Sequence, residues 1–161
     1  YVKNNPRIVG QIHLSPQNDD GIMYYSLGKE KYKKINNKIK QMVKEGKGNK
    51  ILPKEFSPIS YITSIDMYNG YLTDYGKGTL TPYHSPNSPN WKILSEVIMP
   101  ILIVFGSKDI YMKPSVEVAV SLIKEKSNAS VEIIKGAAHS YVGYEKELVK
   151  VIFDWIKKNY L

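Results

Sequence analysis

The most constraining feature of this 161-residue sequence is an uninterrupted apolar run from Ile101 to Phe105. Successive side chains of a β-strand point to opposite faces of the sheet, so a strand without polar residues is expected to be buried on both faces. Such burial is typical of a parallel sheet that carries helices on each side. The run therefore predicts a central parallel strand, and it leads directly into Gly106-Ser107-Lys108-Asp109.

Further strands and helices are predicted on either side of this run. A first strand is expected over residues 8–15, and a third strand over residues 131–135 leads into Gly136-Ala137-Ala138-His139. Apolar periodicity and cap residues favour helices over residues 28–45, 60–68 (with Ser60 as its cap), 90–97 and 114–126. A final helix carries a regular apolar stripe of Leu148, Val151, Ile152, Trp155 and Ile156. This alternation predicts an α/β protein with about three parallel strands and covering helices.

Two residues of catalytic type follow the second and third predicted strands. Asp109 and His139 are both expected at the carboxyl edge of the sheet, where catalytic groups gather in open parallel sheets. Each also has an ordinary interpretation, Asp109 as a turn residue bonded to its own backbone and His139 as a loop histidine. The acid-then-histidine order on neighbouring turns favours a catalytic pair. In such a pair His139 takes a proton from a nucleophile, and Asp109 fixes the ring tautomer and stabilises the imidazolium.

The sequence offers no convincing nucleophile for this pair. No Gly-x-Ser-x-Gly motif or close variant occurs in it. Ser107 lies within the Asp109 turn itself. Ser15 lacks the small flanking residues of a sharp strand-to-helix turn, and Ser140 adjoins His139 in the sequence.

No metal or cofactor site is predicted. The chain has no cysteine, and its other histidines lack the spacing of metal ligands: His13 is interpreted as a packed strand residue and His84 as a surface loop residue. No apolar stretch approaches the length of a membrane span, and the first residues lack the apolar core of a secretory signal. Together with the absence of cysteine, this favours a cytoplasmic location.

The net charge of +8 is concentrated in one segment. Ten lysines and two glutamates lie between Lys29 and Lys54, and charges balance over the rest of the chain. A solvated helix face is the simple interpretation; an acidic partner or an anionic membrane surface is the functional one, with the membrane not favoured. Nucleic acid is disfavoured as a partner, because few arginines or aromatic residues are interleaved with the lysines.

Three stretches of the chain resemble the α/β-hydrolase superfamily. PILIVFGSKDIYMKP resembles the strand, acid and following turn of that family, and VEIIKGAAHSYVGYEKELVKVIFDWIKKN looks like its last strand, histidine loop and closing helix. YVKNNPRIVGQIHLSP is similar to the end of the helix after the family's nucleophile and to the next strand. The resemblance implies a hydrolase core made of residues 1–16 and 91–161, with a helical cap inserted over residues 17–90.

The resemblance also implies a function. The chain would be the C-terminal part of an esterase-like serine hydrolase that acts on a small ester or acyl substrate without a cofactor. Only Asp109 and His139 carry over; the nucleophile and the oxyanion-hole amides would lie upstream of this sequence, so the chain alone is expected to be inactive. Without that upstream half, the first strand would expose its edge and associate with the missing half or with another chain.

Other functions stay open on the sequence alone. Peptidases, thioesterases and C–C bond hydrolases of the same family use the same acid and histidine. A different class of function is a non-catalytic hydrolase-fold fragment or interaction module whose working surface is the basic segment 29–54.

Overall fold

The computed structural model describes residues 5–16, 18–56 and 62–161. The chain divides into two compact units, one of Tyr1–Gln17 with Lys92–Leu161 and the other of Asn18–Trp91. We refer to them as the sheet unit and the helical unit. That they are a hydrolase core and its cap stays a prediction.

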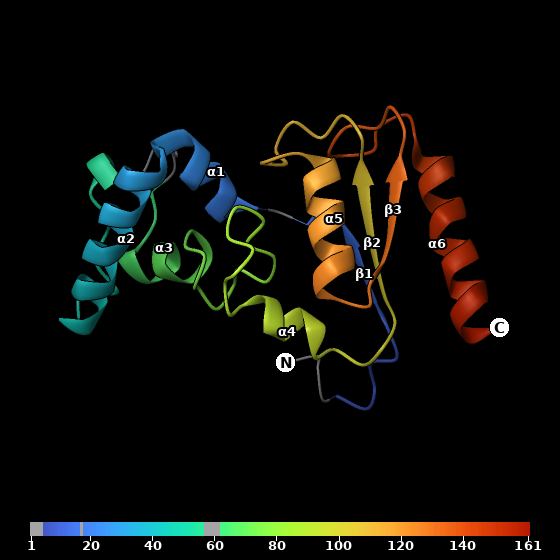
Figure 1. Cartoon of the computed structure of the whole chain (residues 1–161), viewed down its shortest axis with the longest axis horizontal. Coiled ribbons are helices and arrows are strands. Elements are labelled where there is room, and N and C mark those ends of the chain that lie inside the picture. Colours follow the sequence, from blue (N-terminus) through green and yellow to red (C-terminus); the bar gives the residue numbers. More distant parts are fainter. Residues whose placement is uncertain (1–4, 17, 57–61) are drawn as a thin grey trace. The chain divides into compact units, whose positions relative to one another are not determined.

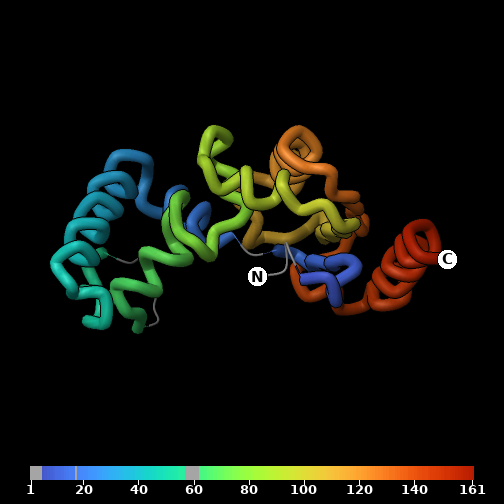
Figure 2. Tube along the Cα trace, turned by 90° about the horizontal axis from the view of Figure 1, so that it is seen from below, coloured from blue at the N-terminus to red at the C-terminus, as the bar shows by residue number. Residues whose placement is uncertain are grey.

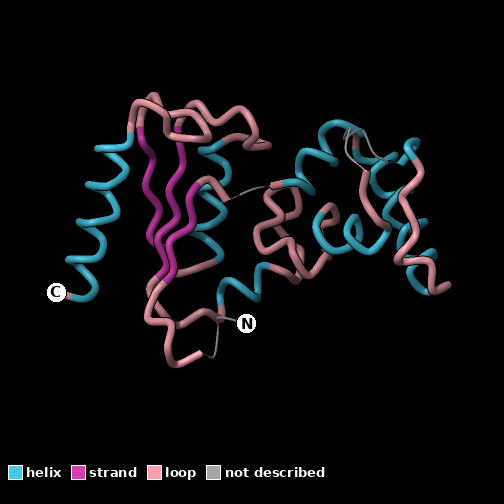
Figure 3. The backbone as a smooth tube through the Cα atoms, turned by 180° about the vertical axis from the view of Figure 1, so that it is seen from behind, coloured by secondary structure: helices cyan, strands magenta, loops and turns pink. Residues whose placement is uncertain are grey.

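The sheet unit is built on three parallel strands. These are β1 (Gln11–Leu14), β2 (Ile101–Gly106) and β3 (Ser130–Ile134), in the order β1-β2-β3 (Figure 3). Every residue of β2 is buried, as its apolar sequence predicts. The predicted α/β class with about three parallel strands is confirmed.

Helices cover both faces of this sheet. The short α4 (Trp91–Ser95) precedes β2, α5 (Val116–Lys126) connects β2 to β3, and α6 (Glu145–Tyr160) follows β3. Helices α5 and α6 lie on opposite faces of the sheet (Figures 1 and 2). The core beneath α6 consists of six buried residues, Leu102, Val104, Ile134, Ala137, Tyr141 and Trp155. The predicted stripe of α6 packs against this core.

The helical unit contains α1 (Asp19–Leu27), α2 (Lys29–Lys44), a 3₁₀ turn (Lys54–Phe56) and α3 (Ile65–Tyr71). Its core gathers the buried faces of these helices: Met23, Tyr32, Ile35, Ile39, Leu52, Ile65, Tyr68 and Leu72. The lysines of α2 occupy the opposite, exposed face, as expected for an amphipathic helix.

The structure departs from the predicted elements most clearly in three places. Helix α1 was not predicted, although Asn18 caps it by accepting the N–H of Gly21 at 3.1 Å. Helix α3 begins at Ile65, because the Ser64 hydroxyl accepts the N–H of Met67 and so defines the N-terminus. The predicted cap Ser60 lies outside the described residues. Strand β1 covers residues 11–14 instead of 8–15.

Candidate active site

Asp109 lies in a tight turn immediately after β2, with its side chain wholly buried. Its backbone N–H donates to the carbonyl of Gly106 at 3.1 Å, and its Oδ1 accepts the backbone N–H of Tyr111 at 3.0 Å. One carboxylate oxygen therefore makes the local bond of an ordinary turn aspartate. The second oxygen, Oδ2, is left for a partner outside the turn.

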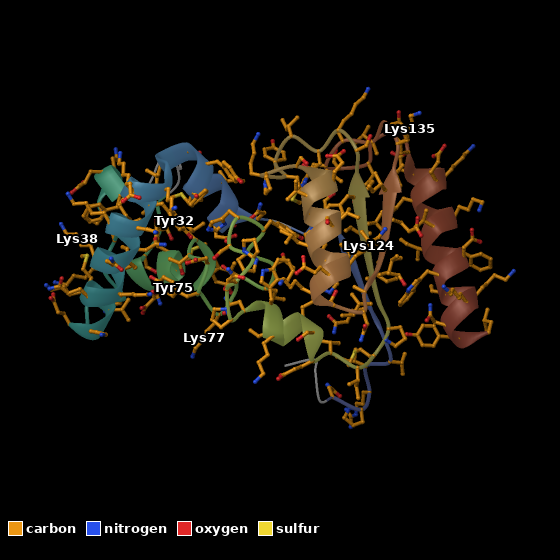
Figure 4. All side chains as sticks on the ribbon, viewed as in Figure 1. Tyr32, Lys38, Tyr75, Lys77, Lys124 and Lys135 are labelled. Atoms are coloured by element: carbon orange, nitrogen blue, oxygen red, sulfur yellow. The ribbon has the colours of Figure 1, made fainter. Side chains whose placement is uncertain are left out.

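His139 supplies that partner from the loop that follows β3, whose end is marked by Lys135 in Figure 4. Its Nδ1 lies 2.8 Å from Oδ2 of Asp109, and its side chain is 38% exposed. The ring of Tyr111 packs edge-on against the imidazole, with centroids 5.1 Å apart. An ionised carboxylate only accepts hydrogen bonds, so Nδ1 is the donor; in the neutral imidazole, Nε2 then holds a lone pair. The structure thus brings together the two residues selected from the sequence.

Backbone hydrogen bonds hold the acid turn against the histidine loop. Ser107 donates its N–H to the carbonyl of Ile134 at 3.1 Å, and Lys108 donates to Ala137 at 2.8 Å. The N–H of Gly136 donates to the hydroxyl of Ser107 at 2.8 Å. These three bonds fix the separation of the two turns. The geometry of the Asp109–His139 pair is therefore set without relying on the hydrogen bond within the pair.

Glycines permit this close approach. A side chain at Gly106 would collide with the backbone carbonyls of Ala137 and Ala138. Gly136 has a φ of +88°, which disfavours other residues, and a side chain there would also collide with the hydroxyl of Tyr144. Both positions therefore require a residue without a Cβ.

Tyr141 forms a second polar connection at this edge, which the sequence did not reveal. Its buried hydroxyl donates to the carbonyl of Val104 at 2.7 Å and accepts both the N–H and the hydroxyl of Ser15, at 3.0 and 2.8 Å. Burial raises the pKa of Tyr141, and the charge of Asp109 acts in the same direction. Ser15 and Tyr141 both have positive φ, 41° and 57°, so this connection stabilises two uncommon backbone conformations.

These contacts account for two of the three serines considered from the sequence, Ser15 and Ser107, and the third, Ser140, is exposed. The hydroxyl of Ser15 is bonded to Tyr141, and that of Ser107 accepts from Gly136. Among the described residues, no hydroxyl group hydrogen-bonds to His139. The arrangement is an oriented imidazole with an accessible ring, and no nucleophile is part of it among the described residues.

The two other histidines have different surroundings. His13 is half-buried in β1, its Nε2 lies 3.0 Å from Oε1 of Gln11, and burial lowers its pKa. The prediction that His84 is a surface loop residue is wrong, because only 2% of its side chain is exposed and its Nδ1 lies 3.2 Å from Oδ2 of Asp20. The described residues contain no group of three or more histidine or acidic side chains that could hold a metal ion.

No protein-family model matches the chain, and no curated protein matches it. No helix in the described part of the chain combines the length and apolar character needed to span a membrane.

Proposed function

We propose that Asp109 and His139 are the acid and base of an α/β-hydrolase-type active site with esterase-like activity. One observation carries the proposal: the 2.8 Å contact between the buried carboxylate and the half-exposed imidazole, at the carboxyl edge of a parallel sheet. The acid precedes the histidine in the chain, which is the order found in that class of enzyme. This edge is also where open α/β sheets place their ligands.

The geometry gives each residue a role. The free Nε2 of His139 takes the proton of an attacking hydroxyl and returns it to the leaving alcohol. Asp109 holds the imidazole in the tautomer that leaves Nε2 unprotonated, and its negative charge stabilises the imidazolium that forms. The wholly buried carboxylate is suited to this role, because water does not screen its interaction with the ring.

The nucleophile and the oxyanion-hole donors of this proposed site come from outside the 161 residues. A serine is the nucleophile expected with an aspartate–histidine pair, and a small ester or acyl compound is the expected substrate. The mechanism requires no metal or cofactor.

The natural protein that contains this chain provides the test. Wild type, His139→Ala and Asp109→Asn are assayed with p-nitrophenyl acetate and with a fluorophosphonate that labels activated serines. We expect the Asp109→Asn variant to lose about 10⁴-fold in kcat, because the ring adopts the wrong tautomer, and the His139→Ala variant to lose at least as much.

His13→Gln is the matched control, because it removes an imidazole from the same sheet without touching the pair. It should retain both turnover and labelling. Undiminished turnover in a folded His139→Ala protein would contradict the proposal. That result would favour the non-catalytic alternative, in which the basic segment 29–54 is the functional surface.

A further inference from the structure

The helical unit holds a second aspartate–histidine pair, distinct from the proposed active site. Asp20 on α1 and His84 in the irregular segment after α3 approach to 3.2 Å, and each side chain is 2% exposed. The ring of Tyr24 stacks on the imidazole with centroids 4.4 Å apart, and Tyr32 packs edge-on against it at 5.3 Å. The two aromatic rings therefore hold the imidazole in one orientation beside the carboxylate.

This pair adjoins a cavity that lies wholly within the helical unit. The cavity has a volume of about 460 Å³, within the range of small-molecule sites. The residues that line it include the buried Tyr32 and Asn36, the half-buried Tyr75, and His84 of the pair. Tyr32 and Tyr75 are labelled in Figure 4. Helix α2 and the segment after α3 thus line a space with both polar and aromatic side chains.

Three buried polar atoms of this lining have no hydrogen-bond partner among the described residues. They are Oδ1 of Asn36 and both ring nitrogens of His84, whose Nδ1 lies near Oδ2 of Asp20 without forming a hydrogen bond. Buried polar groups are nearly always hydrogen-bonded, and leaving one unpaired costs about 1–3 kcal/mol. The amide oxygen requires a donor such as a hydroxyl group. Nε2 of His84 can donate a hydrogen bond to an anion when it carries the ring proton.

The exposed rim of the cavity is positively charged. Lys29, Lys33 and Lys40 line it, and Asp74 is the one carboxylate among the described lining residues, so these side chains carry a net charge of +2. None of the three lysines forms an ion pair with a carboxylate in the part of the chain that the structure describes. Lys40 instead lies over the ring of Tyr75, 3.5 Å from its centroid. A phosphate monoester, with a charge of about −1.5 to −2 at pH 7, matches this excess.

We propose that this cavity binds a small phosphorylated ligand that carries hydroxyl groups, of the sugar phosphate class. The phosphate contacts the lysine rim and the imidazole of His84, and a ligand hydroxyl donates to Oδ1 of Asn36. The aromatic side chains of the lining pack against the apolar face of the sugar ring. The site is independent of the proposed hydrolase activity, since all of its residues belong to the helical unit.

Isothermal titration calorimetry of the whole chain at fixed ionic strength tests the proposal. The probes are D-ribose 5-phosphate, inorganic phosphate and D-ribose. We expect saturable binding in the order ribose 5-phosphate, then phosphate, with no measurable binding of ribose. Lys33→Gln should weaken ribose 5-phosphate binding roughly five- to tenfold through the loss of one charged contact.

Lys34→Gln is the matched control. It makes the same charge change one residue further along α2, at a side chain that is not among the residues lining the cavity. Its affinity should stay within about twofold of wild type. Equal weakening by both variants, binding of ribose as tight as that of ribose 5-phosphate, or no saturable binding to the folded wild type would overturn the proposal. Circular dichroism establishes that each variant is folded.

Discussion

At the scale of single residues, Asp109 combines a local and a long-range role. Oδ1 accepts the backbone amide of Tyr111, which fixes the carboxylate, and Oδ2 is thereby directed to His139. The turn interpretation and the catalytic interpretation of this aspartate are therefore compatible. A carboxylate held in this way loses little conformational freedom when it binds the ring, and this favours a defined tautomer.

Tyr141 is expected to contribute to stability through its hydroxyl group. The Tyr141→Phe change removes the bonds to Ser15 and Val104 and leaves the hydroxyl of Ser15 buried without this partner. We expect the free energy of unfolding to fall by about 1–3 kcal/mol in urea titrations. Tyr144→Phe, on a partly buried tyrosine of the same core, is the control and should change it by less than about 0.5 kcal/mol. Equal effects of the two changes would contradict the assigned role.

His13 should make stability depend on pH. Burial lowers its pKa in the folded state below the ordinary value of 6.5, so the unfolded chain binds the proton more readily. Its contribution is fully present above pH 6.5 and is lost as the pH falls from 6.5 through the lower pKa of the folded state. Between pH 7.5 and 5.5, wild type should therefore lose more free energy of unfolding than His13→Gln. Parallel urea titrations at the two pH values measure the difference, and equal losses would refute it.

At the scale of secondary-structure elements, caps decide where several helices begin. The Ser115 hydroxyl accepts the N–H of Val118 at the start of α5. Ser115→Ala is expected to reduce the free energy of unfolding by about 1 kcal/mol in thermal or urea unfolding, because one N-terminal amide loses its acceptor. Ser121→Ala, at an exposed position inside the same helix, should be neutral or slightly stabilising, since alanine has the higher helix propensity. Destabilisation by Ser121→Ala of the same size would argue against a capping effect.

Elements with a strong local pattern were predictable from the sequence. The apolar run of β2 and the periodic stripe of α6 depend on neighbouring residues only, and both formed as predicted. Helix α1 was missed because its burial includes a polar residue, Asp20, whose partner His84 lies far along the chain. His84 itself follows a polar loop pattern, and only the packing of Tyr24 and Tyr32 around it explains its burial.

The candidate site likewise has one part that the sequence predicts and one part that it does not. The chain order of Asp109 and His139, each after a neighbouring parallel strand, was enough to predict that they meet. The role of Tyr141 was not predictable, because its hydroxyl contacts Ser15, which is 126 residues away in the sequence. No local sequence pattern indicates such a contact. The positive φ of Ser15 and Tyr141 is tied to this contact and does not reflect the backbone preferences of serine and tyrosine.

At the scale of the whole molecule, the sheet leaves apolar surface uncovered on β1. Within the described sheet β1 is an edge strand, with β2 as its neighbour. Ile12 and Leu14 are 39% and 44% exposed, although they pair in register with Leu102 and Val104, which are buried beneath α6. The apolar face under α6 therefore continues onto an open strand, and such edges are templates for association.

We therefore expect the 161-residue chain, expressed alone, to self-associate through this edge. Size-exclusion chromatography with light scattering should show species larger than the monomer that increase with protein concentration. The double change Ile12→Lys and Leu14→Lys should shift the distribution toward monomer, because charges on an edge strand oppose pairing with another strand. Ile98→Lys removes a residue that is 93% exposed outside the sheet, and it should leave association unchanged. A monodisperse wild-type monomer that unfolds cooperatively would show that this edge needs no partner.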